Sequence, residues 1–218
     1  MIVPDPVREA FVSSATLLRA RKGQILIAAG LDASDVYLVL EGRVQVSLVS
    51  PQGRDTIIRD IEANQIFGEL AALDGSMRSA NVIAVEDSKL AVMNGTTFTR
   101  LIGEQPETSI WLARHLTLQI RTLTERIYEL STMAVGSRLH CELLRLCLQR
   151  GVENDVSMIE NAPTHADLAA KIGTNRESVT RELGLLSQEG IIAQKGRHIV
   201  VLTVDRLGAM VQRLNALN

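Results

Sequence analysis

The amino-acid sequence predicts an α+β protein in three sections: an antiparallel β-structure, one long helix, and a winged helix-turn-helix. Three observations support this order. Short strand-like runs separated by glycines fill the first hundred residues. A heptad pattern without Gly or Pro follows, and two short capped helices precede a hairpin near the end. A chain of 218 residues is long enough for one large domain or two modest ones. We place the boundaries at 1–106, 107–136 and 137–218.

The first section contains candidate strands at intervals typical of an antiparallel roll, sandwich or barrel. The segments VYLVL and VQVSL alternate their side chains as strands do when one face is buried. Further candidate strands are ILIAAG, TIIRDI, SANVIAV and KLAVM. Glycines mark the expected turns and strand ends: Gly23, Gly30, Gly42, Gly53, Gly68, Gly75 and Gly95.

The middle section, residues 107–133, predicts one helix with a narrow apolar stripe, because apolar residues recur at alternating spacings of three and four. We call this stripe the seam; its members are Ala113, Leu116, Ile120, Leu123, Ile127 and Leu130. Two interpretations remain open: pairing with a second copy of the chain, or packing against the chain's own β-domain. The 3.5-residue repeat is narrower than an ordinary core-facing stripe and favours a parallel dimer. Gly136 interrupts the pattern and is a candidate hinge.

The last section has the pattern of a helix-turn-helix. An apolar helix ends at Gly151, and a second begins at Thr164, where the Thr-x-x-Asp sequence resembles a capping box. Gly173 then breaks this helix. We expect Thr174 to cap the next helix, with Glu177 three residues on, and we expect that helix to end near Gly190. Two short helices joined by a glycine-containing turn predict the motif, and a hairpin turning at Lys195-Gly196 would form its wing.

In this motif the second helix reads the major groove with its first turns. Arg176, Glu177 and Arg181 lie there; arginine donates to guanine and glutamate accepts from cytosine, so the three side chains suit G·C pairs. Hydroxyl and cationic side chains nearby suit DNA phosphates: Thr174, Thr180, Lys195 and Arg197. The plainer interpretation is an ordinary solvated helix face. The turn, the wing and the seam together favour DNA binding.

The stretch FGELAALDGSMRSA, residues 67–80, places one acid and one base among small and apolar residues. Arg78 could bind a phosphate through two parallel hydrogen bonds, helped by backbone N–H groups at a short turn. Glu69 would repel that phosphate and suits a sugar hydroxyl instead. The alternative is a simple Glu69–Arg78 salt bridge, which would not explain why Gly68 and Ser79 occur in this stretch. We therefore predict a pocket for a sugar joined to a phosphate.

This stretch resembles the phosphate-binding cassette of cyclic-nucleotide-binding domains. Together with KGQILIAAG, LVLEGRV and GTNRESVTREL, the order of β-roll, long helix and winged helix-turn-helix is similar to the cyclic AMP receptor protein / fumarate-nitrate regulator (CRP/FNR) superfamily of bacterial transcription factors, over roughly residues 16 to 205. The resemblance implies a jelly-roll-like β-roll, a homodimer through residues 107–133, palindromic double-stranded DNA and RNA polymerase as partners, and a cyclic nucleotide as effector.

The resemblance also implies roles for single residues. Glu69 would accept from the ribose 2′-hydroxyl, Arg78 would neutralise the cyclic phosphate, and Gly68, Leu70 and Ser79 would add contacts. Two adjacent hydroxyl residues on the family's dimer helix reach the base of cyclic AMP. This sequence has Leu123-Thr124 there, so only Thr124 keeps a hydroxyl. Cyclic AMP is therefore favoured, and cyclic GMP stays possible.

Two other functions stay open: a regulator of the same fold whose pocket is vestigial or accepts another effector such as cyclic di-GMP, and a cyclic-nucleotide module acting on a protein partner. An enzyme is not expected, because the sequence has no nucleophile–base pairing and no Walker-type motif. Two cysteines and four scattered histidines predict no metal site. The net charge of -2 gives no strong field toward a membrane. Without a secretory signal or an apolar run of membrane-spanning length, we expect a cytoplasmic protein.

Overall fold

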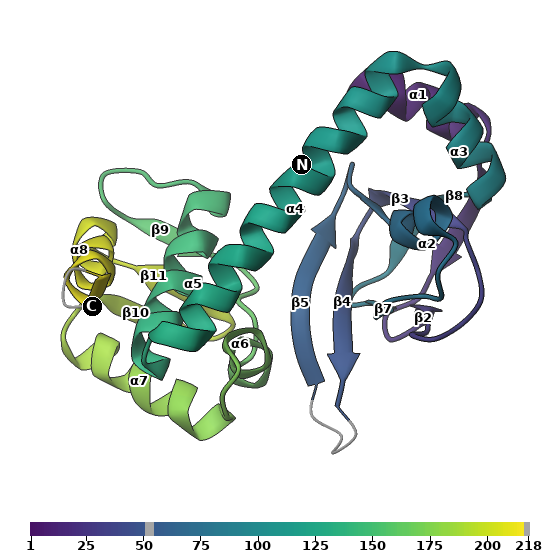
Figure 1. Ribbon diagram of the computed structural model, residues 1–218. Coiled ribbons are helices and arrows are strands. Elements are labelled where there is room, and N and C mark those ends of the chain that lie inside the picture. The colour runs from purple at the N-terminus through teal and green to yellow at the C-terminus, as the bar shows by residue number, and fades with distance from the viewer. Residues whose placement is uncertain (51–54, 216–218) are drawn as a thin grey trace. The chain divides into compact units, whose positions relative to one another are not determined.

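The computed structural model describes residues 1–50 and 55–215 (Figure 1). The turn predicted at Gly53 lies outside these residues. The chain forms two compact units, Met1–Thr122 and Leu123–Asn218, and the helix α4 (Pro106–Thr132) contributes residues to both. The α+β class and the order of β-roll, long helix and helix-turn-helix are confirmed. Within the described residues, no helix has both the length and the apolar character needed to cross a membrane.

The first unit is a roll of two four-stranded antiparallel sheets with the orders β1-β8-β3-β6 and β2-β7-β4-β5. Its strands are β1 (Thr16–Ala20), β2 (Ile25–Ile27), β3 (Val36–Glu41), β4 (Arg43–Val49), β5 (Asp55–Glu62), β6 (Ile66–Phe67), β7 (Asn81–Ala84) and β8 (Ser88–Met93). In β3 and β8, buried side chains of both sheet faces contribute to the core, because Val36 and Leu38 pack in one apolar cluster while Val39 packs in another. Burial on both faces explains the near-continuous apolar runs in these two strands.

Helices that the sequence analysis did not predict complete this unit. They are α1 (Asp5–Ser13), α2 (Glu69–Asp74) and α3 (Gly95–Glu104). Asn94 caps α3 by accepting from the Thr97 amide at 2.8 Å. The helix α2 replaces the short turn expected after Gly68. The candidate strand SANVIAV, expected from Ser79, begins at Asn81, and Arg78 lies in the segment between α2 and β7.

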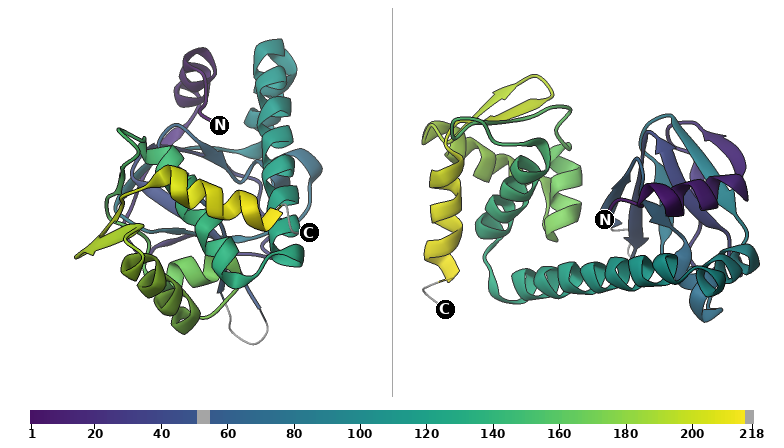
Figure 2. Two further views of the ribbon diagram at one scale, coloured as in Figure 1. Left: turned by 90° about the vertical axis from the view of Figure 1, so that its left-hand side faces the viewer. Right: turned by 90° about the horizontal axis from the view of Figure 1, so that it is seen from above.

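The second unit contains the helix-turn-helix and its wing. Its elements after α4 are α5 (Val135–Arg150), β9 (Ser157–Ile159), α6 (His165–Ile172), α7 (Arg176–Gln188), β10 (Ile192–Lys195), β11 (His198–Val201) and α8 (Val204–Asn215). The strands form one antiparallel sheet in the order β10-β11-β9, and α8 packs against α5 (Figure 2). One apolar core joins α5, α6, α7 and the sheet. Both cysteines lie buried on α5.

The capping predictions for the two short helices had different outcomes. The capping box of Thr164 and Asp167 is present on α6, and Gly173 ends that helix with φ +65°. The cap of α7 is Asn175, whose side chain accepts from the Ser178 amide at 2.8 Å, so the prediction of Thr174 was wrong. Both residue types cap helices well, and the sequence placed them side by side. The wing turns one residue later than expected, at Gly196-Arg197.

The hinge predicted near Gly136 stays a prediction, and the structure gives Gly136 a second explanation. The long helix ends at Thr132, and Gly136 lies in the first turn of α5. A Cβ atom at Gly136 would lie 2.9 Å from a carboxylate oxygen of Glu182 on α7. Gly136 is therefore explained by the close approach of Glu182, while the break between helices falls at Met133-Ala134.

Candidate nucleotide site and nucleic-acid interface

The structure holds Arg78 in place through both its backbone and its side chain. Its amide donates to Leu31 O at 2.9 Å and its carbonyl accepts from Gly30 at 2.8 Å. The guanidinium donates from Nη1 to Gly68 O at 2.8 Å and from Nη2 to Asp35 O at 2.7 Å. The residue is 6% exposed. Burial lowers the pKa of Arg78 from its usual value, and the nearby Tyr37, Asp35 and Glu69 partly offset this effect.

Gly68 is required by this arrangement. Its φ is +83°, a conformation that residues with a Cβ atom rarely adopt. A Cβ atom there would lie 2.7 Å from Asp35 O and 2.9 Å from Arg78 Nη1. Gly68 therefore lets the backbone approach the guanidinium closely enough to accept its hydrogen bond.

Glu69 follows directly and begins α2, with only 2% of its surface exposed. Its Oε1 accepts from Gln119 Nε2 of α4 at 3.0 Å and lies 3.9 Å from Arg59 Nη2 of β5. The Gln119 nitrogen also lies 2.6 Å from His115 Nε2. An amide NH₂ group can donate two hydrogen bonds, so Gln119 serves Glu69 with one and the neutral His115 ring with the other. Burial, with Arg59 and the N-terminus contributing, lowers the pKa of His115 to about 4.

These contacts contradict the alternative of a simple Glu69–Arg78 salt bridge. Among the described residues no ion pair joins Glu69 to Arg78: the carboxylate is matched by Gln119 and Arg59, and the guanidinium by two carbonyl groups. An arginine has five N–H donors, so binding two carbonyls leaves Arg78 with further donors for an anion. The Arg78 guanidinium and the Glu69 carboxylate therefore lie in the same cassette without forming an ion pair with each other.

The other side chains predicted to contact the effector are exposed, unlike Glu69 and Arg78. Leu70 and Ser79 are exposed at the start of α2 and beside Arg78. Thr124 is exposed on α4 within the second unit, and its contact with an effector stays a prediction. The sequence analysis missed Gln119 and Arg59, because they lie 50 residues after and ten before Glu69 and belong to no local motif.

The proposed DNA-contacting residues are exposed or partly exposed in the second unit. Arg176, Glu177 and Arg181 are exposed on the first turns of α7. The opposite face of this helix carries Val179, Leu183 and Leu186, all buried in the core, so packing fixes which side of α7 meets solvent. Lys195 and Arg197 of the wing and Thr180 of α7 are exposed, and Thr174 is partly exposed.

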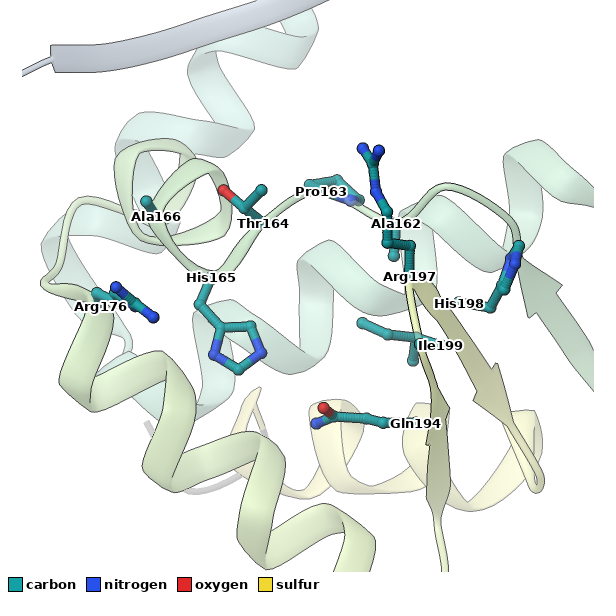
Figure 3. Close-up of a pocket in the computed structure, with 11 residues that line it drawn as sticks. Ala162, Pro163, Thr164, His165, Ala166, Arg176, Gln194, Arg197, His198 and Ile199 are labelled. Atoms are coloured by element: carbon teal, nitrogen blue, oxygen red, sulfur yellow. The ribbon is translucent and has the colours of Figure 1, made fainter.

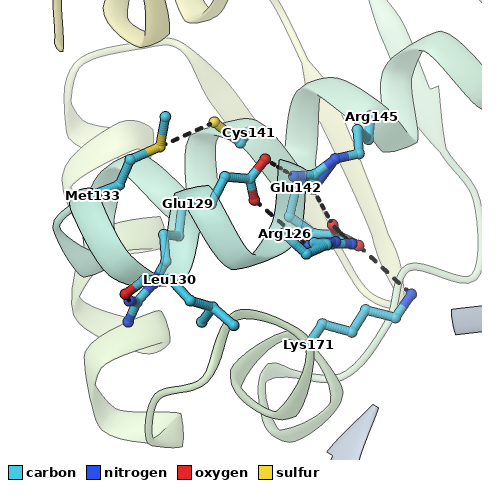
Figure 4. A network of polar contacts seen from close by, with 9 residues as sticks. Arg126, Glu129, Leu130, Met133, Cys141, Glu142, Arg145 and Lys171 are labelled. Carbon is cyan, nitrogen blue, oxygen red and sulfur yellow. Dashed lines mark hydrogen bonds and ion pairs between the residues drawn. The ribbon is translucent and has the colours of Figure 1, made fainter. Parts of the chain in front are cut away.

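A cluster of charged side chains joins the last turns of α4 to α5 and α6 (Figure 4). Glu142 of α5 is 3% exposed and lies 2.6 Å from Arg126, 2.9 Å from Arg145 and 3.6 Å from Lys171. Arg145 also pairs with Glu129 of α4. We call these five residues the junction cluster. Breaking a buried pair of this kind leaves an uncompensated charge, so the cluster fastens the end of α4 to the helix-turn-helix.

A second set of contacts reaches the turn of the motif itself. Arg138 of α5 donates to the carbonyl groups of Leu130 and Gly173, each at 3.3 Å. A Cβ atom at Gly173 would lie 2.9 Å from the Leu130 side chain. The last seam residue of α4 therefore lies directly against the turn between α6 and α7.

The seam remains largely solvent-exposed along α4. Four of its apolar members are 45–65% exposed: Ile120, Leu123, Ile127 and Leu130. By contrast, the buried face near the start of α4 includes Trp111, Leu112 and His115, which pack in the first unit. One seam residue, Leu116, is partly buried and packs against the same cluster, so the exposed run of large apolar seam residues begins at Ile120.

Comparison with known proteins supports the division of the chain into two functional parts. Residues 17–105 match the family of cyclic nucleotide-binding domains, and residues 137–210 match the family of Crp-like helix-turn-helix domains. The cAMP-activated global transcriptional regulator CRP of Haemophilus influenzae is 28% identical over 198 residues, covering 90% of this chain and 88% of that protein.

Two solved structures show the same fold. FixK2 from Bradyrhizobium japonicum aligns with a TM-score of 0.79 at 21% identity, over 89% of this chain and 96% of that one. The c-di-GMP-responsive global regulator CLP of Xanthomonas campestris aligns with a TM-score of 0.78 at 17% identity, over 89% and 97%. The relatives are transcription regulators, which are not enzymes. Within the described residues, no group of three metal-ligating side chains occurs.

Proposed function

The chain belongs to the CRP/FNR superfamily of transcription regulators, and we propose that it is a homodimeric, sequence-specific DNA-binding regulator gated by a cyclic nucleotide. Cyclic AMP is the favoured effector, because the Haemophilus influenzae relative is a cAMP-activated regulator. The observation that carries the proposal is the placement of Arg78 beside Glu69, both buried and each matched by other groups. In this proposal Arg78 binds the cyclic phosphate and Glu69 accepts from the ribose hydroxyl.

The dimer in this proposal forms through the seam of α4. Exposed Leu123, Ile127 and Leu130 recur at the spacing of parallel paired helices, and burying them against a second copy would remove a costly apolar stripe from water. RNA polymerase is the protein partner that the family resemblance implies for such a regulator.

Gating would act through α4, because this helix contributes residues to the proposed effector site, to the seam and to the junction cluster. Gln119 donates to the carboxylate of Glu69, the seam runs along the same helix from Ala113 to Leu130, and Arg126 and Glu129 belong to the junction cluster. An effector hydroxyl that donates to Glu69 would compete with Gln119 and change the position of this side chain on α4. The effector can shift the equilibrium only by its preference for the DNA-competent form, typically by about 1–3 kcal/mol.

Calorimetric titration of the full chain with cyclic AMP, cyclic GMP and cyclic di-GMP tests the effector. We expect cyclic AMP to bind most tightly and Arg78→Leu to abolish binding. Because Arg78 also binds two buried carbonyl groups, this variant needs a thermal unfolding control at the titration temperature. A folded Arg78→Leu variant that binds normally would exclude the assigned phosphate contact.

Two observations favour cyclic di-GMP as the second candidate. Leu123 occupies the place of the first hydroxyl expected for a cyclic AMP site, and the similarly folded CLP is responsive to c-di-GMP. Tight binding of cyclic di-GMP with no heat from cyclic AMP would support this candidate and leave the fold and DNA-binding proposals standing.

A DNA-binding assay tests the output of the regulator. We propose that Arg176, Glu177 and Arg181 read bases in a duplex with two inverted TGTGA half-sites. Arg181→Ala should weaken binding to this duplex by ~1–3 kcal/mol and weaken binding to scrambled duplex far less. A uniform loss on both would assign Arg181 to a phosphate. Failure of the wild type to bind either duplex would favour a module that acts on a protein partner.

A further inference from the structure

A pocket of about 470 Å³ lies between the start of α6, the start of α7 and the wing (Figure 3). The residues that line it come from the 162–166 segment, Arg176 and the 194–199 segment. They include two arginines and two histidines, and none of them is acidic. The chain as a whole has a net charge of -2, so this composition is a local property that suits an anion.

His165 points from the first position of α6 into this pocket (Figure 3). Its Nδ1 lies 2.8 Å from the hydroxyl of Thr180 on α7, and that hydroxyl lies 3.0 Å from the carbonyl of Arg176. A carbonyl oxygen only accepts. Both contacts are therefore satisfied together only when Thr180 donates to Arg176 and His165 Nδ1–H donates to Thr180.

This arrangement has consequences for both side chains. The single hydroxyl proton of Thr180 is used within the protein, so Thr180 has no donor left for a DNA phosphate. In His165 the hydrogen bond fixes the ring and leaves Nε2 as the free position. Neutral imidazole presents a lone pair at Nε2, whereas protonated imidazole presents an N–H donor and a positive charge.

We propose, on the basis of the proposed DNA-binding function, that His165 is a phosphate-contacting residue of the DNA interface and that Thr180 is the residue that positions it. A backbone phosphate enters the pocket between α6 and the wing and accepts from Nε2–H of the protonated ring. Arg176 of α7 and Arg197 and His198 of the wing also face this pocket. The carboxylate of Asp167 on α6 is held by the hydroxyl and amide of Thr164.

The test measures how DNA affinity depends on salt at two pH values. Full-length protein with cyclic AMP is titrated onto a labelled mixed-sequence duplex at about pH 5.5 and about pH 8, either side of the range in which histidines usually titrate. Each phosphate neutralised adds about 0.9 to the slope of log affinity against log salt. We expect the wild-type slope to be steeper at the lower pH by about this amount per protomer.

Matched variants separate His165 from the other titrating groups. His165→Gln should remove the difference in slope between the two pH values, while His140→Gln, at a buried histidine of α5 that does not line the pocket, should keep it. Thr180→Val should reduce the difference, and Thr180→Ser, which restores a hydroxyl, should recover it. Circular dichroism checks that each variant is folded at both pH values.

Each result has a distinct meaning. A wild-type slope that does not change with pH, or a change that survives in His165→Gln, overturns the phosphate contact. A Thr180→Val variant that behaves like the wild type overturns the positioning role. If no duplex is bound at either pH, the proposed function fails together with this inference, whereas binding without the pH effect contradicts this inference alone.

Discussion

Gln119 binds Glu69 through a 3.0 Å hydrogen bond that spans 50 positions of the sequence. The bond is a direct contact between α4 and the carboxylate proposed to bind the ribose. We predict that Gln119→Leu retains cyclic AMP binding but reduces the effect of cyclic AMP on DNA affinity. Coupling of this kind is usually worth about 5–150-fold. DNA titrations with and without cyclic AMP measure that ratio directly.

The control for this variant lies two residues earlier on the same helix. Thr117 is exposed and its hydroxyl donates to Ala113 O within α4. Thr117→Val also replaces a polar side chain with an apolar one but touches neither Glu69 nor His115. Equal losses of coupling in both variants would contradict a specific role for Gln119.

Gly68→Ala should destabilise the protein, because the new Cβ atom meets both Asp35 O and Arg78 Nη1 at a residue with φ +83°. A residue forced into such a conformation costs about 1–3 kcal/mol, and the contacts add to that cost. Gly75→Ala is the matched control: its φ is +69°, and no atom lies within 4 Å of the place that a new Cβ would occupy. Urea unfolding should show a larger loss for Gly68→Ala than for Gly75→Ala, together with loss of nucleotide binding only at Gly68.

Ile127→Asp should separate the proposed dimer. Ile127 is 65% exposed in the single chain, so the charge costs little there, but it would be buried in the seam of a dimer. Leu118→Asp is the control, because Leu118 is 46% exposed on α4 and lies outside the seam. Sedimentation velocity should detect monomers for Ile127→Asp and dimers for Leu118→Asp; dimers for both would contradict the seam.

Glu142→Gln should unfold more easily than the wild type. The substitution keeps the shape of the side chain but leaves Arg126, Arg145 and Lys171 without the carboxylate that they surround. Removing one partner of a buried ion pair costs about 3–5 kcal/mol. Glu41→Gln disrupts an exposed pair with Lys89 and should cost about 0–1 kcal/mol. Denaturant unfolding of both variants provides the comparison.

His115 should make stability fall with acidification. Its pKa is about 4 in the folded protein against an ordinary value of 6.5, so the unfolded chain binds more protons between these values. Stability contributed by the neutral ring is therefore complete above about pH 6.5 and is lost as the pH falls toward 4, by up to about 3 kcal/mol. His115→Gln should flatten the stability curve in this window, whereas an unchanged curve would assign the pH dependence to other groups.

Local patterns predicted the elements whose signal lies in adjacent residues. The period-two runs became β3 and β4, the heptad became α4, and the Thr164 capping box is present as predicted. Positions where neighbouring residues compete were less predictable. Thr174 and Asn175 can both cap α7, and the structure uses Asn175, whose side chain reaches the Ser178 amide.

Contacts between distant segments carried no sequence signal. Gly136 was interpreted as a hinge, yet its need for a small residue comes from Glu182 on another helix. The cassette motif identified Glu69 and Arg78, but their partners Gln119 and Asp35 come from separate elements. The junction cluster likewise combines residues of α4, α5 and α6 that only the tertiary fold brings together.

The junction cluster also indicates where chimeric regulators should be spliced. The break between α4 and α5 at Met133-Ala134 is the obvious place to exchange the helix-turn-helix section between relatives. A cut there would take Arg126 and Glu129 from one parent and Glu142 and Arg145 from the other. A cut before Arg126 keeps these four side chains from one parent. Hybrids spliced at the earlier position should express as folded proteins more often than hybrids spliced at the break.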